Sequence, residues 1–184
     1  MKTRTKSEPR AGHSGRRHDR AGEHAFADVG QLVLIAVFMA VWITDSFLFP
    51  FSGFLSAHVP AFIRWPAGLA VVAVAALLAI EAHQKIFGGV TRQSGVVADG
   101  AYAIVRHPMY LGSWLFFLGL TLTTLSLAAA GVLLVMLAFY LFISGHEEKL
   151  LLAMFGSRYR EYQAATPMFF PLRFRVPKRT GPSP

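Results

Sequence analysis

The chain has 184 residues, of which 54% are hydrophobic, carries a formal net charge of +8 and contains no cysteine. This composition is too apolar for an ordinary soluble domain and indicates an integral membrane protein. The missing cysteine excludes disulfides, thiolate metal ligands and a cysteine nucleophile, and the sequence predicts no metal site.

The chain begins with a polar segment, residues 1–28, that is rich in Arg, His, Gly and Ser. We expect a disordered, basic tail that faces anionic lipid. About four apolar stretches follow, each close to the roughly 20 residues that a helix needs to cross a bilayer. They do not alternate apolar and polar residues as the strands of a membrane barrel do. The sequence therefore predicts an all-α integral membrane protein with spans near residues 29–51, 66–87, 109–123 and 125–145, and a fifth if the outer loop re-enters the membrane.

The basic residues are placed unevenly along the chain. Seven Lys and Arg precede the first span and seven follow Glu148, whereas the loop between the first two spans carries only Arg64. Because basic loops stay on the cytoplasmic side, both termini are predicted to be cytoplasmic, in a plasma or inner membrane. Topology and lipid charge explain the positive balance, so we expect no nucleic-acid partner. Asp45 falls near the outer interface, where a structural role for an acid is the simpler interpretation.

The second predicted span ends in the polar run Glu81-Ala82-His83-Gln84-Lys85. Two interpretations stay open for Glu81 and His83: a solvated helix end, or the border of a substrate cavity. The loop after it contains glycines but no GxGxxG pattern, so a dinucleotide-binding fold is not supported.

A first motif stands before the third span and reads Gly100-x-Tyr102-x-x-x-Arg106-His107-Pro108-x-Tyr110-x-Gly112. Pro108 suits the first position of a helix, where a missing N–H costs nothing. Arg106 and His107 then precede a helix N-terminus, which favours anions. This arrangement predicts a corner that binds a carboxylate or a phosphate. The alternatives are that Arg106 obeys charge topology, His107 caps the helix and Gly112 serves helix packing.

A second motif follows the last span, with Glu147 and Glu148 at its start. Steps of four and three residues predict one amphipathic cytoplasmic helix over residues 147–162, on which Glu148 shares a face with Leu152, Phe155, Tyr159 and Tyr162. Pro167 limits this helix. Phe169 and Phe170 are then expected to return the chain to the membrane surface or to cover a cavity, before a basic, disordered tail over residues 172–184.

Together the two motifs resemble those of the isoprenylcysteine carboxyl methyltransferase and phospholipid methyltransferase superfamily of integral membrane enzymes. The resemblance covers residues 92–171 and includes Phe155-Gly156-x-x-Tyr159-x-x-Tyr162 and Phe170-Pro171. It implies a methyltransferase core over residues 88–171, which follows two spans in residues 29–87. It also implies a cytoplasm-facing pocket for S-adenosylmethionine, whose product is S-adenosylhomocysteine.

The resemblance further implies roles for individual residues. Arg106, His107 and Glu148 would be catalytic. The cofactor would be held by Val97, Gly100, Tyr102, His107, Pro108, Tyr110, Gly112, Glu147 and Glu148. If the polar end of the second span borders a substrate cavity, the candidate substrate contacts are Glu81, His83, Arg106 and Tyr159.

The acceptor implied by the resemblance is a lipophilic or lipid-modified molecule that carries a carboxylate, because the spacing around Gly100 and Tyr159 looks closer to the isoprenylcysteine branch. Such an acceptor is already a nucleophile and needs no general base, whereas an amine must first lose a proton. However, Ser144-Gly145-His146 lacks the arginine that would serve as a second carboxylate anchor. Phospholipid N-methylation is therefore one alternative, and a non-catalytic membrane scaffold or transporter subunit is another.

Overall fold

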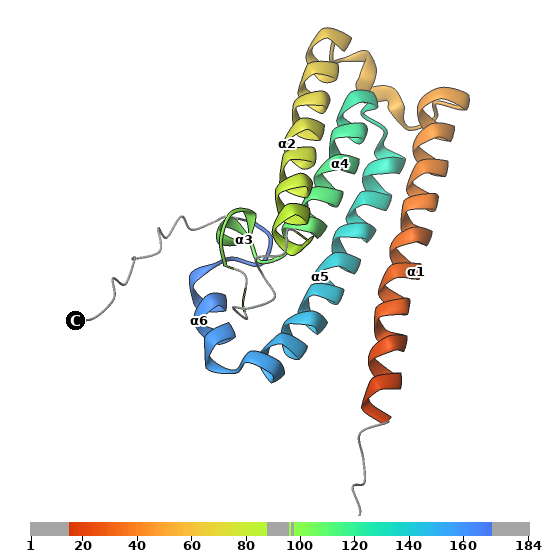
Figure 1. Cartoon of the computed structure of the whole chain (residues 1–184). Coiled ribbons are helices and arrows are strands. Elements are labelled where there is room, and N and C mark those ends of the chain that lie inside the picture. The colour runs from red at the N-terminus through yellow and green to blue at the C-terminus, as the bar shows by residue number, and fades with distance from the viewer. Residues whose placement is uncertain (1–14, 88–95, 97, 171–184) are drawn as a thin grey trace, which may run out of the picture. The chain divides into compact units, whose positions relative to one another are not determined.

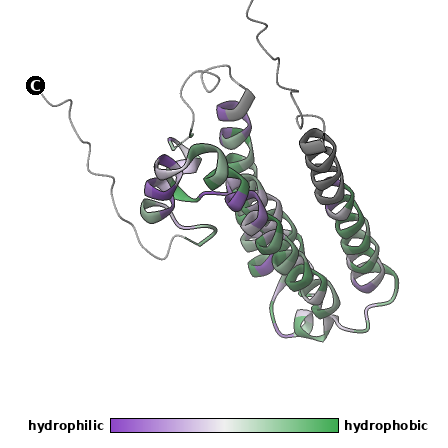
Figure 2. Ribbon diagram, turned by 90° about the horizontal axis from the view of Figure 1, so that it is seen from below, coloured by the Kyte–Doolittle hydropathy of each residue, from purple (hydrophilic) through white to green (hydrophobic). Residues whose placement is uncertain are grey.

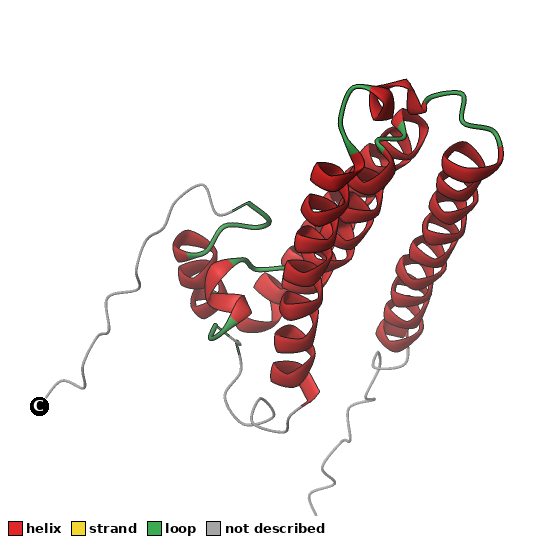
Figure 3. Cartoon of the chain, turned by 90° about the horizontal axis from the view of Figure 1, so that it is seen from above, coloured by secondary structure: helices red, strands yellow, loops and turns green. Residues whose placement is uncertain are grey.

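The computed structural model describes residues 15–87, 96 and 98–170, and this part of the chain holds helices and loops but no strand (Figure 1). Figure 3 shows the same division into helices and connecting loops. The all-α class predicted from the sequence is confirmed. The elements, in order, are α1 (Gly15–Ile43), the π-helical turn η1 (Thr44–Leu48), the 3₁₀ turn η2 (Gly53–Ala57), α2 (Ala61–Phe87), α3 (Ala101–Ile104), α4 (Pro108–Thr124), α5 (Leu127–Phe155) and α6 (Ser157–Ala165).

The contacts of the chain divide it into two units, Met1–Ala36 and Val37–Pro184. In the first unit, the described part is the helical backbone of α1 from Gly15 onward. The second unit contains the end of α1 and all the remaining elements. The packed helices and the functional-site residues both belong to the second unit.

Three segments are long and apolar enough to cross a membrane: Asp28–Leu48, Ala61–Lys85 and Leu127–Phe155. The other predicted span forms α4, whose 17 residues give a length of about 26 Å, shorter than the roughly 30 Å hydrocarbon core of a bilayer. Figure 2 shows that α2, α4 and α5 are largely hydrophobic, whereas hydrophilic residues gather on α6. The membrane class is thus supported, and four crossings stay a prediction.

Two helix starts differ from the expected boundaries. Helix α1 begins at Gly15, so residues 15–28 are helical where a disordered tail was expected, because extending an existing helix by one residue costs far less than starting one. Helix α2 begins at Ala61 and includes Pro66, which removes one backbone hydrogen bond from the helix. The rest of the predicted basic tail and the expectations for residues 88–95 and 172–184 fall outside the described residues.

The predicted hairpin between the third and fourth apolar stretches is confirmed, and its turn is very short. Only Leu125 and Ser126 separate α4 from α5. Leu125 takes a left-handed conformation with φ 54°, and the Ser126 hydroxyl accepts a hydrogen bond of 3.0 Å from the amide of Ala129. Ser126 therefore caps α5 in the way that serine commonly caps helices.

The prediction of a single helix over residues 147–162 is wrong, because Gly156 ends one helix and a second helix begins after it. This glycine has φ 58° and ψ −126°, a conformation that residues with a Cβ rarely adopt. Glu147 and Glu148 therefore belong to the end of α5, and α6 is a separate helix that ends before Pro167, as expected. The break lets α6 fold back toward the acids of α5.

Glycines allow α2 and α4 to pack closely along their length. A Cβ on Gly68 would lie 2.6 Å from the carbonyl oxygen of Gly119, and a Cβ on Gly119 would lie 2.7 Å from the carbonyl oxygen of Gly68. Farther along α4, a Cβ on Gly112 would lie 3.3 Å from the carbonyl oxygen of Ala75. Small residues that bring helix backbones together are typical of membrane interfaces. This packing fixes the start of α4 relative to α2.

Asp45 joins the outer loop to the start of α5. The side chain is 1% exposed and accepts hydrogen bonds from the Ser52 amide (2.9 Å), the Ser52 hydroxyl (2.5 Å) and the Ser126 hydroxyl (2.5 Å). Its charge lies next to a helix N-terminus, where a negative charge is stabilised. Asp45 thus has the structural role expected of it.

We predict that Gly119→Ala lowers the midpoint of thermal unfolding in detergent, because the new methyl group meets the backbone of α2 and overpacking of this kind costs about 1–3 kcal/mol. Gly131→Ala is the matched control, since nothing lies within 4 Å of a Cβ at that position of α5. The control should unfold at the same temperature as the original protein or slightly higher, because alanine favours helices. Equal midpoints for the two variants would contradict this account of the interface.

Candidate functional site

The first motif places its basic residues at the start of α4, as the sequence predicts. Pro108 is the first residue of the helix, and His107 precedes it with φ −122° and ψ 63°. The His107 carbonyl accepts the first helical hydrogen bond from the amide of Leu111 at 3.0 Å. Val105 is extended and fully buried. Arg106 and His107 are consequently fixed just before the N-terminus of α4.

The second motif brings its acids to the same place. The Arg106 Nε atom lies 2.9 Å from Oε1 of Glu148, and His107 Nε2 lies 3.2 Å from the same oxygen. Because a carboxylate only accepts hydrogen bonds, His107 Nε2 carries a proton and donates. His107 Nδ1 lies 3.6 Å from Oε2 of Glu147. The hairpin therefore joins two motifs that stand some forty residues apart in the sequence.

Two further side chains complete the arrangement. The Tyr110 hydroxyl donates to Oε1 of Glu147 at 2.6 Å. From α6, Gln163 Nε2 donates to Oε2 of Glu148 at 2.8 Å, while the Gln163 carbonyl accepts from Arg106 Nη1 at 3.2 Å. We call Arg106, His107, Glu147, Glu148 and Gln163 the polar cluster. Sequence reasoning missed Gln163, although its place four residues after Tyr159 puts both on one face of a helix.

The segment after α6 covers the polar cluster. Backbone hydrogen bonds run from the Arg106 amide to the Pro167 carbonyl (2.9 Å) and from the His107 amide to the Met168 carbonyl (3.3 Å). Phe169 is 2% exposed, and its ring lies nearly parallel to that of His107 with centroids 6.1 Å apart. The structure thus gives this segment the covering role that was one of its two expected placements.

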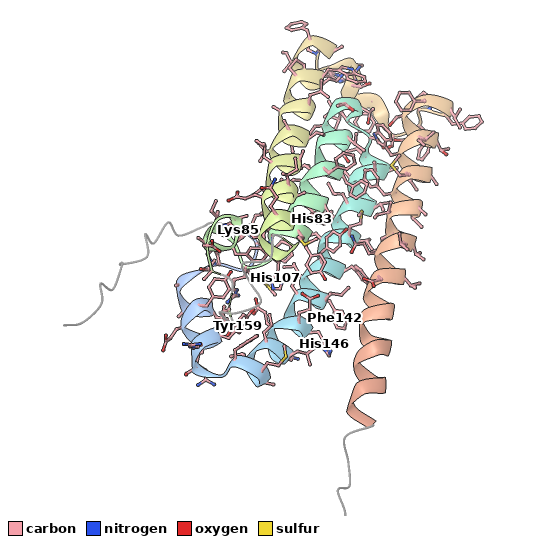
Figure 4. The ribbon with its side chains drawn as sticks, viewed as in Figure 1. His83, Lys85, His107, Phe142, His146 and Tyr159 are labelled. Atoms are coloured by element: carbon pink, nitrogen blue, oxygen red, sulfur yellow. The ribbon has the colours of Figure 1, made fainter. Side chains whose placement is uncertain are left out.

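Aromatic rings continue from this cover into the helices. The ring of His107 is nearly parallel to that of Tyr110, at 5.9 Å, and Tyr110 is nearly parallel to Tyr140, at 5.4 Å. Together with Phe169 they form a row of four rings beside the polar cluster. Figure 4 shows His107 and Tyr159 close together at the end of the helices from which α6 folds back.

Burial changes the acid–base behaviour of this region. Burial lowers the pKa of His107 from its ordinary value, and the charges of Glu147 and Glu148 oppose that shift. Burial also raises the pKa of Tyr102 and of Tyr159 to about 12, with Glu147 and Glu148 respectively adding to the effect. At neutral pH both phenols keep their protons, and His107 is neutral.

The anion-binding corner predicted beside α4 is filled by the chain itself. Arg106 is paired with Glu148, so it does not stand ready for a free anion. With His107 neutral, one arginine and two carboxylates leave the polar cluster with a net charge of −1. A partly buried site with this net charge attracts a cation. The predicted corner that binds only a carboxylate or a phosphate is therefore wrong, and the site instead contains both basic and acidic side chains.

Other residues implied by the resemblance lie at varying distances from the polar cluster. The Tyr102 carbonyl accepts from the Tyr162 hydroxyl at 2.6 Å. Gly100 has φ 61°, and a Cβ there would lie 2.6 Å from Glu81 Oε1, so Glu81 is next to this turn. Gly112 packs against α2, which agrees with the packing alternative. His83 is exposed on α2, and Figure 4 places it toward the same end of the molecule as His107. Val97 lies outside the described residues.

The residues present fit S-adenosylmethionine. Glu147 keeps a third of its side chain exposed and offers an acceptor for hydroxyl or ammonium groups. The Ser144 hydroxyl, one turn before Glu148 on α5, is fully buried and has no hydrogen-bond partner. The Nε–H of Arg106 is also buried without a hydrogen-bond partner, because the N–H bond does not point at the nearby carboxylate oxygen. The net charge suits a sulfonium ion. Within the described residues, no group of three His, Asp or Glu side chains is arranged to hold a metal ion.

We predict that acid destabilises the protein partly through His107. Because its pKa is lower in the folded chain than the ordinary value of about 6.5, its neutral form contributes stability above that pH, and this contribution is lost as the pH falls through the folded pKa. Thermal midpoints measured from pH 7.5 down to pH 5 should therefore fall less steeply in His107→Gln. His58→Gln, which removes an exposed histidine, is the control and should keep the original slope; equal slopes for all three would contradict the prediction.

Known proteins are similar to part of this chain. A model of the family "Phospholipid methyltransferase" matches residues 64–158, just over half of the chain. The cobalt-zinc-cadmium resistance protein CzcN of Cupriavidus metallidurans is 36% identical over 81 residues, which are 44% of this chain and 37% of that protein. The protein-S-isoprenylcysteine O-methyltransferase of Schizosaccharomyces pombe is 35% identical over 80 residues, which are 42% of this chain and 33% of that enzyme.

The chain thus spans about a third of the length of these curated relatives. The matched region of the family model includes α2, α4 and α5 with the Arg106–Glu148 pair, and one of the relatives is a methyltransferase by name. These findings support a membrane methyltransferase and confirm the resemblance seen in the two motifs. The chain belongs to the phospholipid methyltransferase family.

Proposed function

We propose that this protein transfers a methyl group from S-adenosylmethionine to a lipophilic acceptor in the membrane, and that the acceptor atom is a carboxylate oxygen. One observation carries the proposal: Arg106 and His107 at the start of α4 share a carboxylate oxygen of Glu148 on α5. This contact unites the two motifs of the family in a single site at the edge of the apolar helices.

S-adenosylmethionine supplies an electrophilic methyl group on a sulfonium. Glu147 and Glu148 would hold its positively charged and hydroxyl-bearing parts. Phe169 and the rings of Tyr110 and Tyr140 exclude water, which strengthens these interactions. A carboxylate acceptor needs no base, so the residues have only to hold the two reactants in line.

Phospholipid N-methylation is the second candidate, and the net charge of the polar cluster favours it. A site with charge −1 attracts the ammonium group of an aminophospholipid. That group must lose a proton before it attacks, and the neutral His107 has an unprotonated Nδ1 that can accept one. The family description and the named yeast relative point to different acceptors, so experiment must separate them.

We predict that Glu148→Gln weakens binding of S-adenosylhomocysteine about tenfold or more, because it removes charge-assisted hydrogen bonds that are worth about 1.5–3 kcal/mol each and disturbs Arg106 and Gln163. The measurement is titration calorimetry on the full chain in a mild detergent. Glu161→Gln removes an exposed acid of α6 and is the matched control, with unchanged affinity expected. If the original chain binds no S-adenosylhomocysteine while it remains folded, the proposed function is wrong.

The acceptor is identified by its product. Membranes containing the chain, supplied with S-adenosylmethionine that bears a labelled methyl group, should yield a lipid-soluble product whose label is released as methanol by mild base, as a methyl ester requires. Label that resists base and travels with methylated phosphatidylethanolamine would instead establish N-methylation. The Glu148→Gln and Glu161→Gln variants serve as the inactive and active controls.

A further inference from the structure

A cavity of about 170 Å³ lies at the other end of the helices from the polar cluster. The residues around it come from η1, the loop that contains η2, the start of α2, the end of α4 and the turn to α5. They include Asp45, Ser46, Arg64, Trp65, Thr124 and Ser126. The polar cluster flanks the first residue of α4, whereas this cavity flanks its last. The full length of α4 separates the two sites, so the cavity is no part of the methyl-transfer site.

The positively charged guanidinium of Arg64 lines this cavity and is not paired with a carboxylate of the described residues. Its Nε is buried and has no hydrogen-bond partner, and its Nη1 reaches only the Thr124 carbonyl at a long 3.5 Å. In the described part of the chain, no carboxylate oxygen is paired with the guanidinium. Arg64 is partly buried, and a charge that is partly removed from water without a counter-charge is unfavourable. An acceptor inside the cavity would therefore stabilise Arg64.

A second donor points to the same conclusion. The Ser46 hydroxyl lines the cavity, and its oxygen is buried without a partner. Asp45 also lines the cavity, but its two oxygens accept from Ser52 and Ser126, and the N-terminus of α5 lies beside it. The negative charge of Asp45 is thereby compensated within the fold, whereas the Nε–H of Arg64 and the hydroxyl of Ser46 have no hydrogen-bond partner among the described residues.

The position of the cavity selects the kind of anion. The candidate membrane segments Asp28–Leu48 and Ala61–Lys85 end and begin beside it. The rings of Phe47, Phe51 and Trp65 are exposed around this end, and exposed aromatic rings are typical of the membrane–water interface. The abundant anion at that depth is the phosphate of lipid headgroups, and an arginine fork matches phosphate geometry.

We propose that Arg64 and Ser46 bind the phosphate of a membrane phospholipid in this cavity. The volume exceeds that of a few waters at about 30 Å³ each, which leaves room for one phosphate group. The acyl chains then lie against the exposed rings, outside the cavity. No covalent step is involved, and the site acts as a lipid anchor at the membrane face opposite to the methyl-transfer site.

The test uses the full chain in a mild non-ionic detergent and records the thermal midpoint as dihexanoyl phosphatidylglycerol is added. We expect a saturable rise with the original chain and with Arg160→Gln, which removes an exposed arginine of α6. In Arg64→Gln the concentration needed for half of the rise should increase about tenfold or more, because a charge-assisted, bidentate contact is lost. Ser46→Ala removes one hydroxyl and should cause a smaller increase, which keeps the proposal testable if Arg64→Gln does not fold.

Two further ligands separate the sources of the effect. Dihexanoyl glycerol, which lacks the phosphate, should cause no rise that depends on Arg64. An equal rise with inorganic phosphate at the same concentrations would assign the cavity to a free anion and overturn the lipid proposal. The proposal is also overturned if Arg64→Gln and Ser46→Ala respond to phosphatidylglycerol as Arg160→Gln does. None of these readouts involves the methyl donor, so the result is independent of the proposed function.

Discussion

The carboxylate of Glu148 is the interaction on which the arrangement of the site depends. It receives Arg106 and His107 from the start of α4 and Gln163 from α6, so three separate segments meet at one buried side chain of α5. A buried ion pair depends on further hydrogen bonds to its remaining lone pairs and protons. Gln163 supplies one to Glu148 and accepts one from Arg106, whereas the Nε–H of Arg106 has no hydrogen-bond partner among the described residues. The residues that hold these segments together are thus the ones that we propose contact the methyl donor.

Close packing of the helices brings these side chains together. Gly68 and Gly119 let α2 and α4 approach backbone to backbone, and the two-residue turn at Leu125 and Ser126 returns α5 along α4. Since the hairpin is so short, the start of α4 and the end of α5 are brought to the same side. The extra length of α5 over α4 then carries Glu147 and Glu148 to the level of His107, and the break at Gly156 turns α6 back over them.

The acidic side chains at the two ends of the packed helices differ in how completely their hydrogen bonds are satisfied. Asp45 at one end is surrounded by serine donors and a helix N-terminus, which satisfies it completely and gives it a structural role. Glu147 at the other end keeps a third of its side chain exposed and shares a net negative charge with its neighbours. A site that is fully satisfied by its own chain stabilises the fold, whereas one with residual charge and orphan donors is suited to a ligand. That contrast also distinguishes Asp45 from the nearby Arg64, which has no carboxylate partner among the described residues.

The sequence by itself determined the helical class, the tight hairpin, the start of α4 at Pro108 and the pairing of two motifs, because hydropathy and the missing N–H of proline act locally. It also determined membership of the family, since both motifs are contiguous in the chain. Only the tertiary structure decided that Glu148 fills the corner beside α4, that Gln163 joins it and that Gly112 packs against α2. These outcomes depend on how far α5 extends and on the conformation of Gly156, where the 3.6-residue period of the sequence continues but the helix does not. The spacing of apolar residues does not show that the chain changes direction at Gly156. In the fold, that change of direction decides where α6 lies and which residues it contacts.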